Sequence, residues 1–447
     1  MFVDIKGLPT NPTVNGKDFS KLLAEEHKKM IADHSPNVYR EIPGWIVVGR
    51  GENDWTLRIK QTKEGAEEEK EVLDFQAMYS TLNAGVVNKR AIRVFQEFLA
   101  GSHAPAIPRA IDHTLHAPAL EAIRKFTGME MVIMKSGGAE AVETAIHIAF
   151  QYWIRHNKEK YENAKKSLPY IISAKNNFHG RTLLARSLSA HSSRNNFGPL
   201  LQNIIHVPFN DAPSIEQELK KHSGEIAAVI LEPIQGGGGV HVPDEHYLNA
   251  VEHLCNKNNI VFILDEIQTG FGTTGTDFAF EYYNVVPDLL CSGKAAGAGV
   301  VPVSFVAGKK KIMGVLSPGT EGATWSAAPI QCLAILIAIQ EFSDNKLSEQ
   351  SAEKGVYARV LFDALWKKHP DIITNVRGKG LFIGIDTVYE GHTLSVSLLE
   401  EGLWAKETGA DGKTIRLSPP LVIPKEEIAR AVAMFEKALI RLQGRTL

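Results

Sequence analysis

Cysteine, long apolar runs and an excess of charge of either sign are all scarce in this sequence. The 447 residues include three cysteines, Cys255, Cys291 and Cys332, too few and too widely spaced for a disulfide framework or a zinc site. No apolar run approaches the roughly 20 residues that cross a bilayer. The residues 1–6 lack the basic-then-apolar pattern of a secretory signal. Together these absences favour a cytoplasmic protein that does not enter a membrane.

The charge balance and the missing catalytic patterns narrow the function further. Forty-nine basic residues against 51 acidic ones leave a net charge of −2, without the basic field that nucleic-acid-binding proteins present to phosphates. The sequence contains no His-Glu-x-x-His, no Walker A pattern, no Gly-x-Ser-x-Gly and no clustered histidines and cysteines. We therefore expect an enzyme that binds neither nucleic acid nor a metal ion.

Short apolar runs alternate with helical stretches from about residue 131 onwards. Each run is too short for a helix and too continuously apolar for a strand with one exposed face, so it predicts a strand buried on both faces. The runs are 131–134, 170–172, 227–231, 261–264, 289–291 and 303–307. Strands that alternate with helices indicate an α/β domain with a mostly parallel sheet.

The pattern changes at both ends of the chain. An apolar helix over 331–342, an amphipathic segment to about 368, two strand-like pieces (381–385 and 414–417) and a helix from about 425 to 442 predict a smaller α+β lobe. The first seventy residues read as irregular, with the charged run 63–71 as a solvated hairpin tip or loop. We expect an N-terminal segment of the small lobe (1–75), a large domain (76–330) and a C-terminal small domain (331–447).

Candidate site residues follow the predicted strands, because ligands in open α/β sheets bind beyond the carboxyl ends of the strands. The turn 135–139 leads into a helix and suits a phosphate, although an ordinary helix cap explains it equally well. In the segment 177–182, Phe178 and Arg181 could stack on a ring and hold a carboxylate, or lie in a surface loop. The glycines 236–239 form either a close-packed turn or part of a site.

Asp265 is the strongest single feature. It follows the run 261–264 directly, where a carboxylate is costly to bury without a cationic or hydrogen-bonding partner. Lys294 follows the run 289–291 among small residues. A lysine in such a place is either solvated or held with a lowered pKa as a nucleophile, and the residues alone leave both open.

Taken in order, five of these segments are similar to the class III pyridoxal-phosphate aminotransferases of fold type I. They read Ser-Gly-Gly-Ala-Glu-Ala (136–141), Phe-His-Gly-Arg-Thr (178–182), Glu-Pro-Ile-Gln-Gly (232–236), Leu-Asp-Glu-Ile-Gln-Thr-Gly (264–270) and Ser-Gly-Lys-Ala (292–295). Asp265 and Lys294 are 29 positions apart, which suits this family. The resemblance runs from about residue 74 to the C-terminus. Within the family it is greatest to ornithine aminotransferases, on the segments 75–80, 376–381 and 415–423.

The resemblance implies a homodimer with a large seven-stranded sheet domain and pyridoxal phosphate as its coenzyme. Lys294 would bind the coenzyme aldehyde and move a proton between the substrate Cα and C4′. Asp265 would pair with the pyridinium nitrogen and keep it protonated. Gln268 would hydrogen-bond the ring's 3′ oxygen, and Phe178 would stack on the ring.

The same resemblance assigns the phosphate to the helix start after the first strand. The N–H groups around Gly138 and Ala139 would hold it, joined by Thr324 from the partner subunit. The segment that carries Thr324 departs from the family's Ser/Thr-x-Gly-Gly-Asn-Pro, since it reads Ala-Thr-Trp-Ser-Ala-Ala-Pro (323–329). Trp325 would therefore narrow the pocket.

Three further residues would bind substrate. Arg181 would receive a substrate carboxylate that Tyr79 helps to position, and Arg416 would bind the α-carboxylate. The family's ornithine and 4-aminobutyrate enzymes carry, where this chain has Gly237, a glutamate that pairs with this arginine. Its loss favours α-amino substrates or a racemase-like outcome. The N-terminal tyrosine that touches ornithine has no clear match, and residues 40–41 fall near its position.

We therefore expect a ping-pong exchange between an amino acid, ornithine-like or related, and a 2-oxoacid such as 2-oxoglutarate. A pyridoxal-phosphate racemase or epimerase of the same fold is the alternative, in which Lys294 returns the proton to Cα. A third interpretation is a non-catalytic scaffold, against which the intact Lys294 and Asp265 argue.

Overall fold

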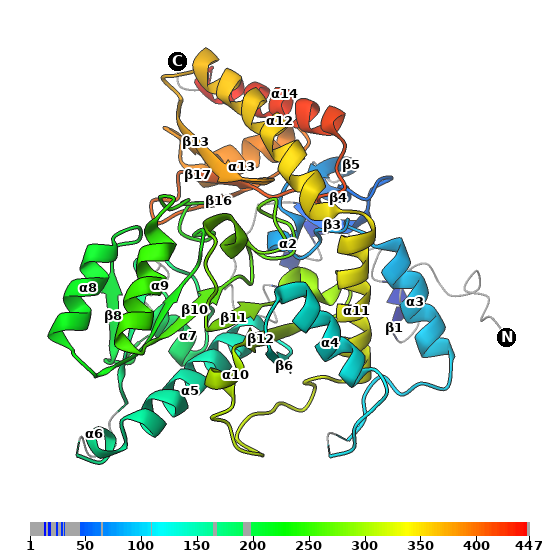
Figure 1. The fold of residues 1–447 in the computed structure, drawn as a ribbon. Coiled ribbons are helices and arrows are strands. Elements are labelled where there is room, and N and C mark those ends of the chain that lie inside the picture. Colours follow the sequence, from blue (N-terminus) through cyan, green and yellow to red (C-terminus); the bar gives the residue numbers. More distant parts are fainter. Residues whose placement is uncertain are drawn as a thin grey trace.

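The computed structural model describes residues 13–14, 17–18, 24–25, 28–29, 31, 45–63, 66–108, 110–163, 168–190 and 198–444. Residues 40–41, expected near the substrate, lie outside these ranges. A large layered α/β body forms the lower part of the molecule in Figure 1, and a smaller α+β lobe with the helices α12 and α14 lies above it. Within the described ranges, no helix is both long and apolar enough to cross a membrane.

The central sheet contains seven strands in the described part of the chain, in the order β6-β12-β11-β10-β9-β7-β8. They are β6 (Met131–Lys135), β7 (Tyr170–Ala174), β8 (Ile204–Val207), β9 (Ile226–Leu231), β10 (Val261–Asp265), β11 (Leu289–Ser292) and β12 (Ser304–Gly308). Strand β12 runs antiparallel to both of its neighbours, β11 and β6, and the other pairs are parallel. The predicted, mostly parallel sheet is confirmed, and β8 is the strand that the apolar runs did not predict.

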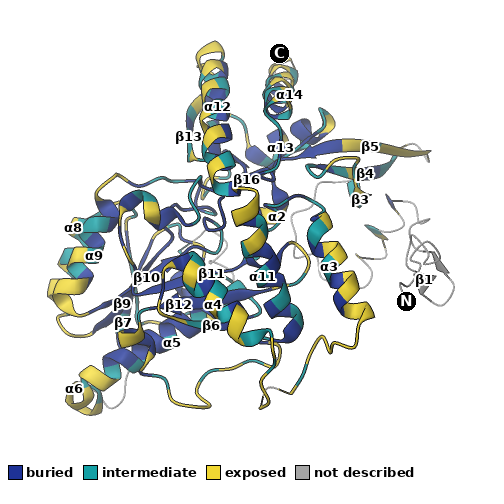
Figure 2. Ribbon diagram, turned by 45° about the vertical axis from the view of Figure 1, so that its right-hand side comes forward, coloured by how far each residue is buried: buried dark blue, intermediate teal, exposed yellow. Residues whose placement is uncertain are grey.

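Successive residues of the strands face opposite sides of this sheet. Val261 and Ile263 contribute to one hydrophobic cluster, whereas Phe262 and Leu264 contribute to another. The first cluster is covered by α5 (Gly138–His156), and the second by α4 (His116–Thr127), α9 (Tyr247–Asn258) and α11 (Pro329–Asp344). Figure 2 shows the strands between these helices as buried. The edge strand β6 departs from the expectation of burial on both faces, because Met131 is exposed.

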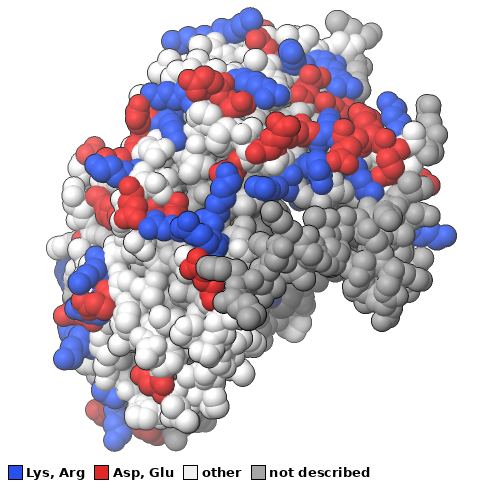
Figure 3. All heavy atoms as spheres, turned by 90° about the vertical axis from the view of Figure 1, so that its right-hand side faces the viewer, with Lys and Arg blue, Asp and Glu red and all other residues white. Residues whose placement is uncertain are grey.

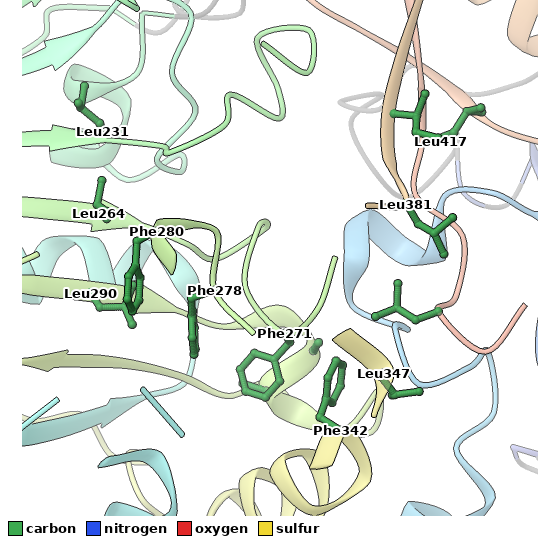
Figure 4. Close-up of a cluster of buried hydrophobic side chains, with 14 of the residues drawn as sticks. Leu231, Leu264, Phe271, Phe278, Phe280, Leu290, Phe342, Leu347, Leu381 and Leu417 are labelled. Carbon is green, nitrogen blue, oxygen red and sulfur yellow. The ribbon is translucent and has the colours of Figure 1, made fainter. Parts of the chain in front are cut away.

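Shorter elements complete the large body. They are α2 (Ala77–Ser80), α3 (Lys89–Ala100), α6 (Lys158–Asn163), α7 (Leu183–Leu188), α8 (Ala212–Lys221), α10 (Lys310–Met313) and the 3₁₀ turns η4 (Ala279–Tyr283) and η5 (Lys294–Gly297). An aromatic cluster next to the strand ends ties the loop after β10 to α11 (Figure 4). In it, the Phe271 ring meets Phe342 edge-on, with 5.3 Å between centroids.

The small lobe is built around a four-stranded sheet in the order β13-β14-β17-β16. Its elements are α12 (Leu347–Lys368), β13 (Ile373–Lys379), β14 (Phe382–Thr387), α13 (Gly391–Glu400), β16 (Lys406–Thr408), β17 (Thr414–Leu417) and α14 (Lys425–Gln443). A second sheet, in the order β15-β5-β4-β3, joins β15 (Leu403–Trp404) to β3 (Trp45–Arg50), β4 (Thr56–Lys63) and β5 (Ala66–Asp74). The short strands β1 (Thr13–Val14) and β2 (Lys17–Asp18) pair with each other.

The charged N-terminal run is more ordered than predicted. Interpreting 63–71 as a hairpin tip or loop was wrong for most of it, because β4 and β5 form a long antiparallel hairpin that includes these glutamates. Ion pairs across it, Lys60–Glu67 and Arg58–Glu69, each span 2.8 Å. Figure 3 shows one face of the molecule, where side chains of both charges gather in the upper part and uncharged residues dominate the lower part. Opposite charges that pair across strands stabilise an exposed hairpin with few apolar residues.

Candidate active site

A cavity of about 460 Å³ opens beside the carboxyl ends of the central strands. Six of the residues predicted to bind the coenzyme line it: Gly138, Ala139, Phe178, Asp265, Gln268 and Lys294. The cavity also takes in Met78, Thr81, His179, Glu232 and residues 299–303. Residues from 78 to 303 thus meet at one edge of the sheet, as the rule for open α/β sheets predicts.

Asp265 and Lys294 share this cavity because their strands are neighbours. Strands β10 and β11 run parallel, and Asp265 lies opposite Cys291 in their register. Lys294 follows three residues later, after the strand has ended at Ser292. Its backbone has φ of 50°, a left-handed conformation that costs a non-glycine residue free energy. Such strain occurs most often at functional sites.

The amino group of Lys294 is half-buried in the cavity and has no partner among the described residues. Across the described ranges, no hydrogen bond or ion pair reaches it, although it lies in the cavity with Asp265. Burial, and after it the positive charge of the nearby Arg416 guanidinium, lower the pKa of Lys294 to about 7. The carboxylates of Asp265 and Glu232 act in the opposite direction. Near neutral pH a large fraction of Lys294 is therefore an unprotonated amine, which is the nucleophilic form.

Asp265 is a buried acceptor at the floor of the cavity. Its Oδ2 atom lies 2.7 Å from Nδ1 of His179, and Oδ1 accepts the backbone N–H of Ile267 at 3.1 Å. The aspartate is 4% exposed, so these contacts replace most of its water. The side chain of His179 was not among the predicted site residues. Its place next to Phe178 in the sequence was the available signal.

Glu232 is a second buried carboxylate in the cavity, and the sequence did not predict it as a site residue. It accepts the backbone N–H of Phe178 at 2.7 Å and that of Gly236 at 3.0 Å. Burial raises the pKa of Glu232 to about 7, and the hydrogen bonds from Phe178 and Gly236 oppose that rise. Through these two bonds the carboxyl group fixes the backbone of the ring-stacking candidate Phe178 to the glycine turn that begins at Gly236.

The start of α5 offers free donors to the cavity. The carboxylate of Glu140 takes the N–H groups of Ser136 and Gly137, at 3.1 and 2.7 Å. The N–H groups of Gly138 and Ala139 receive no acceptor from the described residues, and both residues line the cavity. Free N–H groups at the positive end of a 19-residue helix suit a phosphate.

Arg416 lies on β17 and is 3% exposed. Burial lowers its pKa, and no carboxylate in the described part of the chain forms an ion pair with it. The ring of Tyr79 lies over the guanidinium, 4.8 Å from ring centroid to Cζ. A side chain at Gly237 would meet Phe178, since an added Cβ would lie 3.0 Å from the Phe178 Cβ. The arginine is therefore available to an incoming carboxylate.

Four predicted residues are not among those that line the cavity: Tyr79, Arg181, Thr324 and Arg416. Arg181 is exposed and is not among the lining residues. Thr324 lines a separate cavity of about 210 Å³, together with Asp112, His113 and His116. Trp325 is 52% exposed and does not narrow the main cavity within one chain.

Comparison with known proteins decides the family. The family model described as aminotransferase class-III matches residues 57–439. The chain belongs to the class III aminotransferase family. It is 34% identical over 407 residues to the ornithine aminotransferase of Bacillus subtilis (strain 168), which covers 91% of this chain and 95% of that protein.

Solved structures of aminotransferases share the fold. The ornithine aminotransferase of Toxoplasma gondii ME49 superposes with a TM-score of 0.85 at 30% identity, covering 97% of this chain and 100% of that one. The acetylornithine aminotransferase of Elizabethkingia anophelis gives 0.79 at 32% identity, covering 94% and 100%. The predicted fold type I is confirmed. The chain is thus an enzyme, a pyridoxal-phosphate-dependent aminotransferase that acts on an amino acid and a 2-oxoacid, and neither a racemase nor a non-catalytic scaffold is favoured.

The cavity of this aminotransferase fits pyridoxal phosphate. Gln268 Nε2 is a buried donor with no partner among the described residues, as a group that awaits a ring oxygen would be. Gly236 lies so close that an added Cβ would be 2.3 Å from Gln268 Oε1, so the glycine leaves room for that amide. The unpaired Lys294 and the free N–H groups of Gly138 and Ala139 would meet the aldehyde and the phosphate.

Proposed function

We propose that this aminotransferase transfers an amino group from ornithine or a closely related basic amino acid to a 2-oxoacid such as 2-oxoglutarate. The observation that carries the proposal is the cavity that holds Lys294 and Asp265, with the buried Arg416 near Lys294 and free of any ion pair within the described ranges. The names of the relatives support the choice of donor, because the curated relatives at about a third identity are ornithine aminotransferases.

Each site residue then has a defined task. Pyridoxal phosphate, when bound, supplies an electron sink for the carbanion at the reacting carbon. Lys294 holds the aldehyde and moves the proton between that carbon and C4′. Asp265 keeps the pyridinium nitrogen protonated, Gln268 donates to the 3′ oxygen and Phe178 stacks on the ring.

The substrate is held by its carboxylates. Arg416 binds the α-carboxylate of the 2-oxoacid, and the ring of Tyr79 positions that guanidinium. Arg181 receives the second carboxylate of a dicarboxylic 2-oxoacid when the substrate is bound. Because no carboxylate of the described residues forms an ion pair with Arg416, binding the substrate breaks no ion pair among them.

A second candidate is transamination of the α-amino group. A glutamate at position 237 would neutralise Arg416, and this chain has glycine there. An arginine that stays free favours substrates whose α-carboxylate reaches it in both half-reactions. In the first candidate the δ nitrogen of ornithine is transferred, and in the second candidate the α nitrogen is transferred.

Isotope labelling separates the two candidates. The enzyme is given 2-oxoglutarate with L-ornithine that carries ¹⁵N on either the δ or the α nitrogen, and the glutamate formed is examined by mass spectrometry. Label from the δ nitrogen supports δ-transamination, and label from the α nitrogen supports the second candidate. Glutamate without label from either position would rule out ornithine as the donor.

We further propose that the enzyme is a homodimer in which Thr324 binds the coenzyme phosphate of the partner subunit. Thr324 lies outside the main cavity of its own chain. The exposed apolar side chain of Ile111 lines the same small cavity as Thr324, and the exposed Trp325 follows Thr324 in the sequence. Large exposed apolar side chains of this kind are typical of subunit interfaces.

We also propose that the chain divides into an N-terminal segment (1–75), a large domain (76–330) and a C-terminal small domain (331–447). We propose a cytoplasmic location, which is in keeping with three free, buried cysteines.

Mixing two inactive variants tests the shared site. A heterodimer of Lys294→Ala and Thr324→Ala subunits contains one site with both residues intact only if Thr324 acts across the interface. Denaturing and refolding the two variants together should then restore about a quarter of wild-type activity, from the mixed half of the dimers with one working site each. No recovery above the unmixed variants would place Thr324 in the site of its own chain or in neither.

A further inference from the structure

Four consecutive residues in front of the cavity have left-handed backbone conformations. Ala77, Met78, Tyr79 and Ser80 have φ of 42°, 48°, 60° and 66°. None is a glycine, and each such residue costs free energy because its Cβ approaches the following carbonyl oxygen. Left-handed residues normally occur singly, so a full turn of them needs interactions that hold it in place.

The turn closes its own hydrogen bonds. The N–H of Tyr79 donates to the Gln76 carbonyl at 2.8 Å, and the N–H of Thr81 donates to the Ala77 carbonyl at 2.9 Å. It directs side chains to the site, because Met78 lines the cavity and the Tyr79 ring lies 4.8 Å from Cζ of Arg416. The left-handed conformation of the turn thus determines that Met78 reaches the cavity and that Tyr79 reaches Arg416.

A buried carboxylate holds the entry to the turn. Asp74 is 1% exposed, and its Oδ1 atom accepts the N–H groups of both Gln76 and Ala77, each at 2.9 Å. Burial raises the pKa of Asp74 to about 6, and these two bonds oppose that rise. Hydrogen bonds from N–H groups to a carboxylate are among the stronger ones in proteins.

The same entry is bonded to the strand end that carries Arg416. The N–H of Ser418 donates to the Phe75 carbonyl at 2.8 Å, and its hydroxyl donates to the Gln76 carbonyl at 3.2 Å. Ser418 is two residues beyond Arg416. The entry to the turn and the arginine are therefore fixed to each other at the backbone.

A buried amide holds the exit. Asn83 is 1% exposed, and its Nδ2 atom donates to the Phe271 carbonyl and to Thr273 Oγ1, both at 2.8 Å. The backbone carbonyl of Asn83 accepts the N–H of Leu421 at 2.7 Å. With the exit anchored, the entry at Asp74 is the point at which the strained turn can relax.

We propose that Asp74 is a positioning residue for substrate binding, which holds the left-handed turn and thereby keeps Tyr79 on Arg416 and Met78 in the cavity. This inference rests on the proposed function, since it assigns Arg416 to the substrate carboxylate. Without the acceptor on Asp74, residues 77–80 relax towards ordinary conformations and Tyr79 leaves the guanidinium. Carboxylate binding then weakens, while the proton transfer at Lys294 is unaffected.

The steady-state constants of two matched variants test this role. Asp74→Ala removes the acceptor, and we expect KM for the 2-oxoacid to rise about tenfold while kcat changes by less than about threefold. Asp74→Asn keeps an oxygen that accepts both N–H groups, and we expect KM within about twofold of wild type. An unchanged KM in Asp74→Ala, or equal losses in both variants, would overturn the proposal.

Two further measurements test the strained turn even if Asp74→Ala does not fold. In hydrogen exchange of the wild type and Asp74→Asn, the amides of residues 79–82 should be protected to a similar degree. Ser80 is outside the cavity lining, so Ser80→Gly and Ser80→Ala form a second pair, both without the hydroxyl. In a left-handed position glycine should give the higher melting temperature, whereas elsewhere alanine would. A lower melting temperature for Ser80→Gly than for Ser80→Ala would refute the strained turn.

These outcomes are separable from a failure of the proposed function. If the wild-type enzyme does not transfer an amino group from any basic amino acid, the proposed function fails and exchange and melting still test the turn. If it does transfer one and Asp74→Ala has the wild-type KM, the role of Asp74 fails alone.

Discussion

The amide of Asn177 decides which nitrogen of His179 carries the proton. Asn177 Oδ1 accepts a hydrogen bond from Gln235 Nε2 at 2.7 Å, so its NH₂ group faces the histidine, with Nδ2 3.0 Å from Nε2 of the ring. Nε2 of His179 therefore accepts, and Nδ1 carries the hydrogen that it donates to Asp265 at 2.7 Å. This donation fixes the orientation of the Asp265 carboxylate.

An isosteric neutral side chain tests that charge. We expect Asp265→Asn to lower turnover by roughly 10²–10³-fold, because it removes a preorganised charge from the ring nitrogen. Single-turnover absorbance measurements on the coenzyme-loaded variant check this. The melting temperature of the variant serves as the folding control. Retention of more than about a tenth of wild-type turnover would contradict the role of Asp265.

The lowered pKa of Lys294 predicts a pH dependence of coenzyme capture. Its ammonium is the inactive form, and the pKa of about 7 means that the free amine appears as pH rises through 7. The rate at which coenzyme-free protein takes up pyridoxal phosphate should therefore rise between about pH 6 and pH 8 and then level off. Stopped-flow absorbance at fixed coenzyme concentration measures this rate.

Arg416 provides the control for this pH profile. It is the neighbouring charge that contributes most to the lowering of the Lys294 pKa, so Arg416→Gln should move the midpoint upward. A wild-type rate that rises only towards pH values near 10, the range of an ordinary lysine, would show that Lys294 is not desolvated.

The sequence predicts that Asp265 and Lys294 lie at one edge of the sheet, where the structure places both in one cavity. The apolar runs before Asp265 and Lys294 predict strands that can only be short and buried, and neighbouring parallel strands end at the same edge of a sheet. Their side chains must then meet in one cleft. The donors at Gly138 follow from the same rule, because β6 ends where α5 begins.

Other parts of the structure depend on contacts that the sequence does not reveal. The charged hairpin is held by pairs such as Lys60–Glu67 between strands, which a local pattern of exposed charges cannot distinguish from a loop. The left-handed turn at Met78 contradicts its own residue preferences, since it is imposed by Asp74 and by distant Ser418. Glu232 reads as a strand-end residue until its bonds to two backbone N–H groups are known.

Position 237 should control the choice of amine. We expect Gly237→Glu to raise the ratio of ω-amine to α-amine turnover, because the new carboxylate would neutralise Arg416. The side chain must also displace Phe178, since an added Cβ lies 3.0 Å from the phenylalanine Cβ. Initial rates with a panel of α- and ω-amino donors measure the ratio.

Gly237→Ala is the matched control for this substitution. It introduces the contact with Phe178 without the charge, so it should slow both classes of donor alike. If Gly237→Glu and Gly237→Ala gave the same donor profile, the free Arg416 would not explain the preference.

The buried ion pair between Lys135 and Glu321 should link the turn 135–139, which leads into α5, to the segment that carries Thr324. Lys135 Nζ lies 2.7 Å from Glu321 Oε2, with side chains 5% and 14% exposed. Removing one partner strands a buried charge, so Glu321→Leu should cost about 3 kcal/mol in the free energy of unfolding. The double variant with Lys135→Met should recover most of that loss.

Urea unfolding of these variants, followed by circular dichroism, measures the coupling. The exposed pair Lys220–Glu216, whose side chains are 72% and 44% exposed, is the control, and breaking it should cost below about 1 kcal/mol. Equal losses at the two pairs would contradict the burial argument.

The half-reaction with one donor tests most directly whether Lys294 carries out transamination. The coenzyme-loaded enzyme is mixed with L-ornithine and no 2-oxoacid, and absorbance and released oxo product are followed together. We expect complete conversion of the coenzyme to its amine form with one equivalent of oxo product per site, and neither event in Lys294→Ala. Loss of the donor's optical activity without oxo product, or conversion that persists in Lys294→Ala, would contradict this expectation.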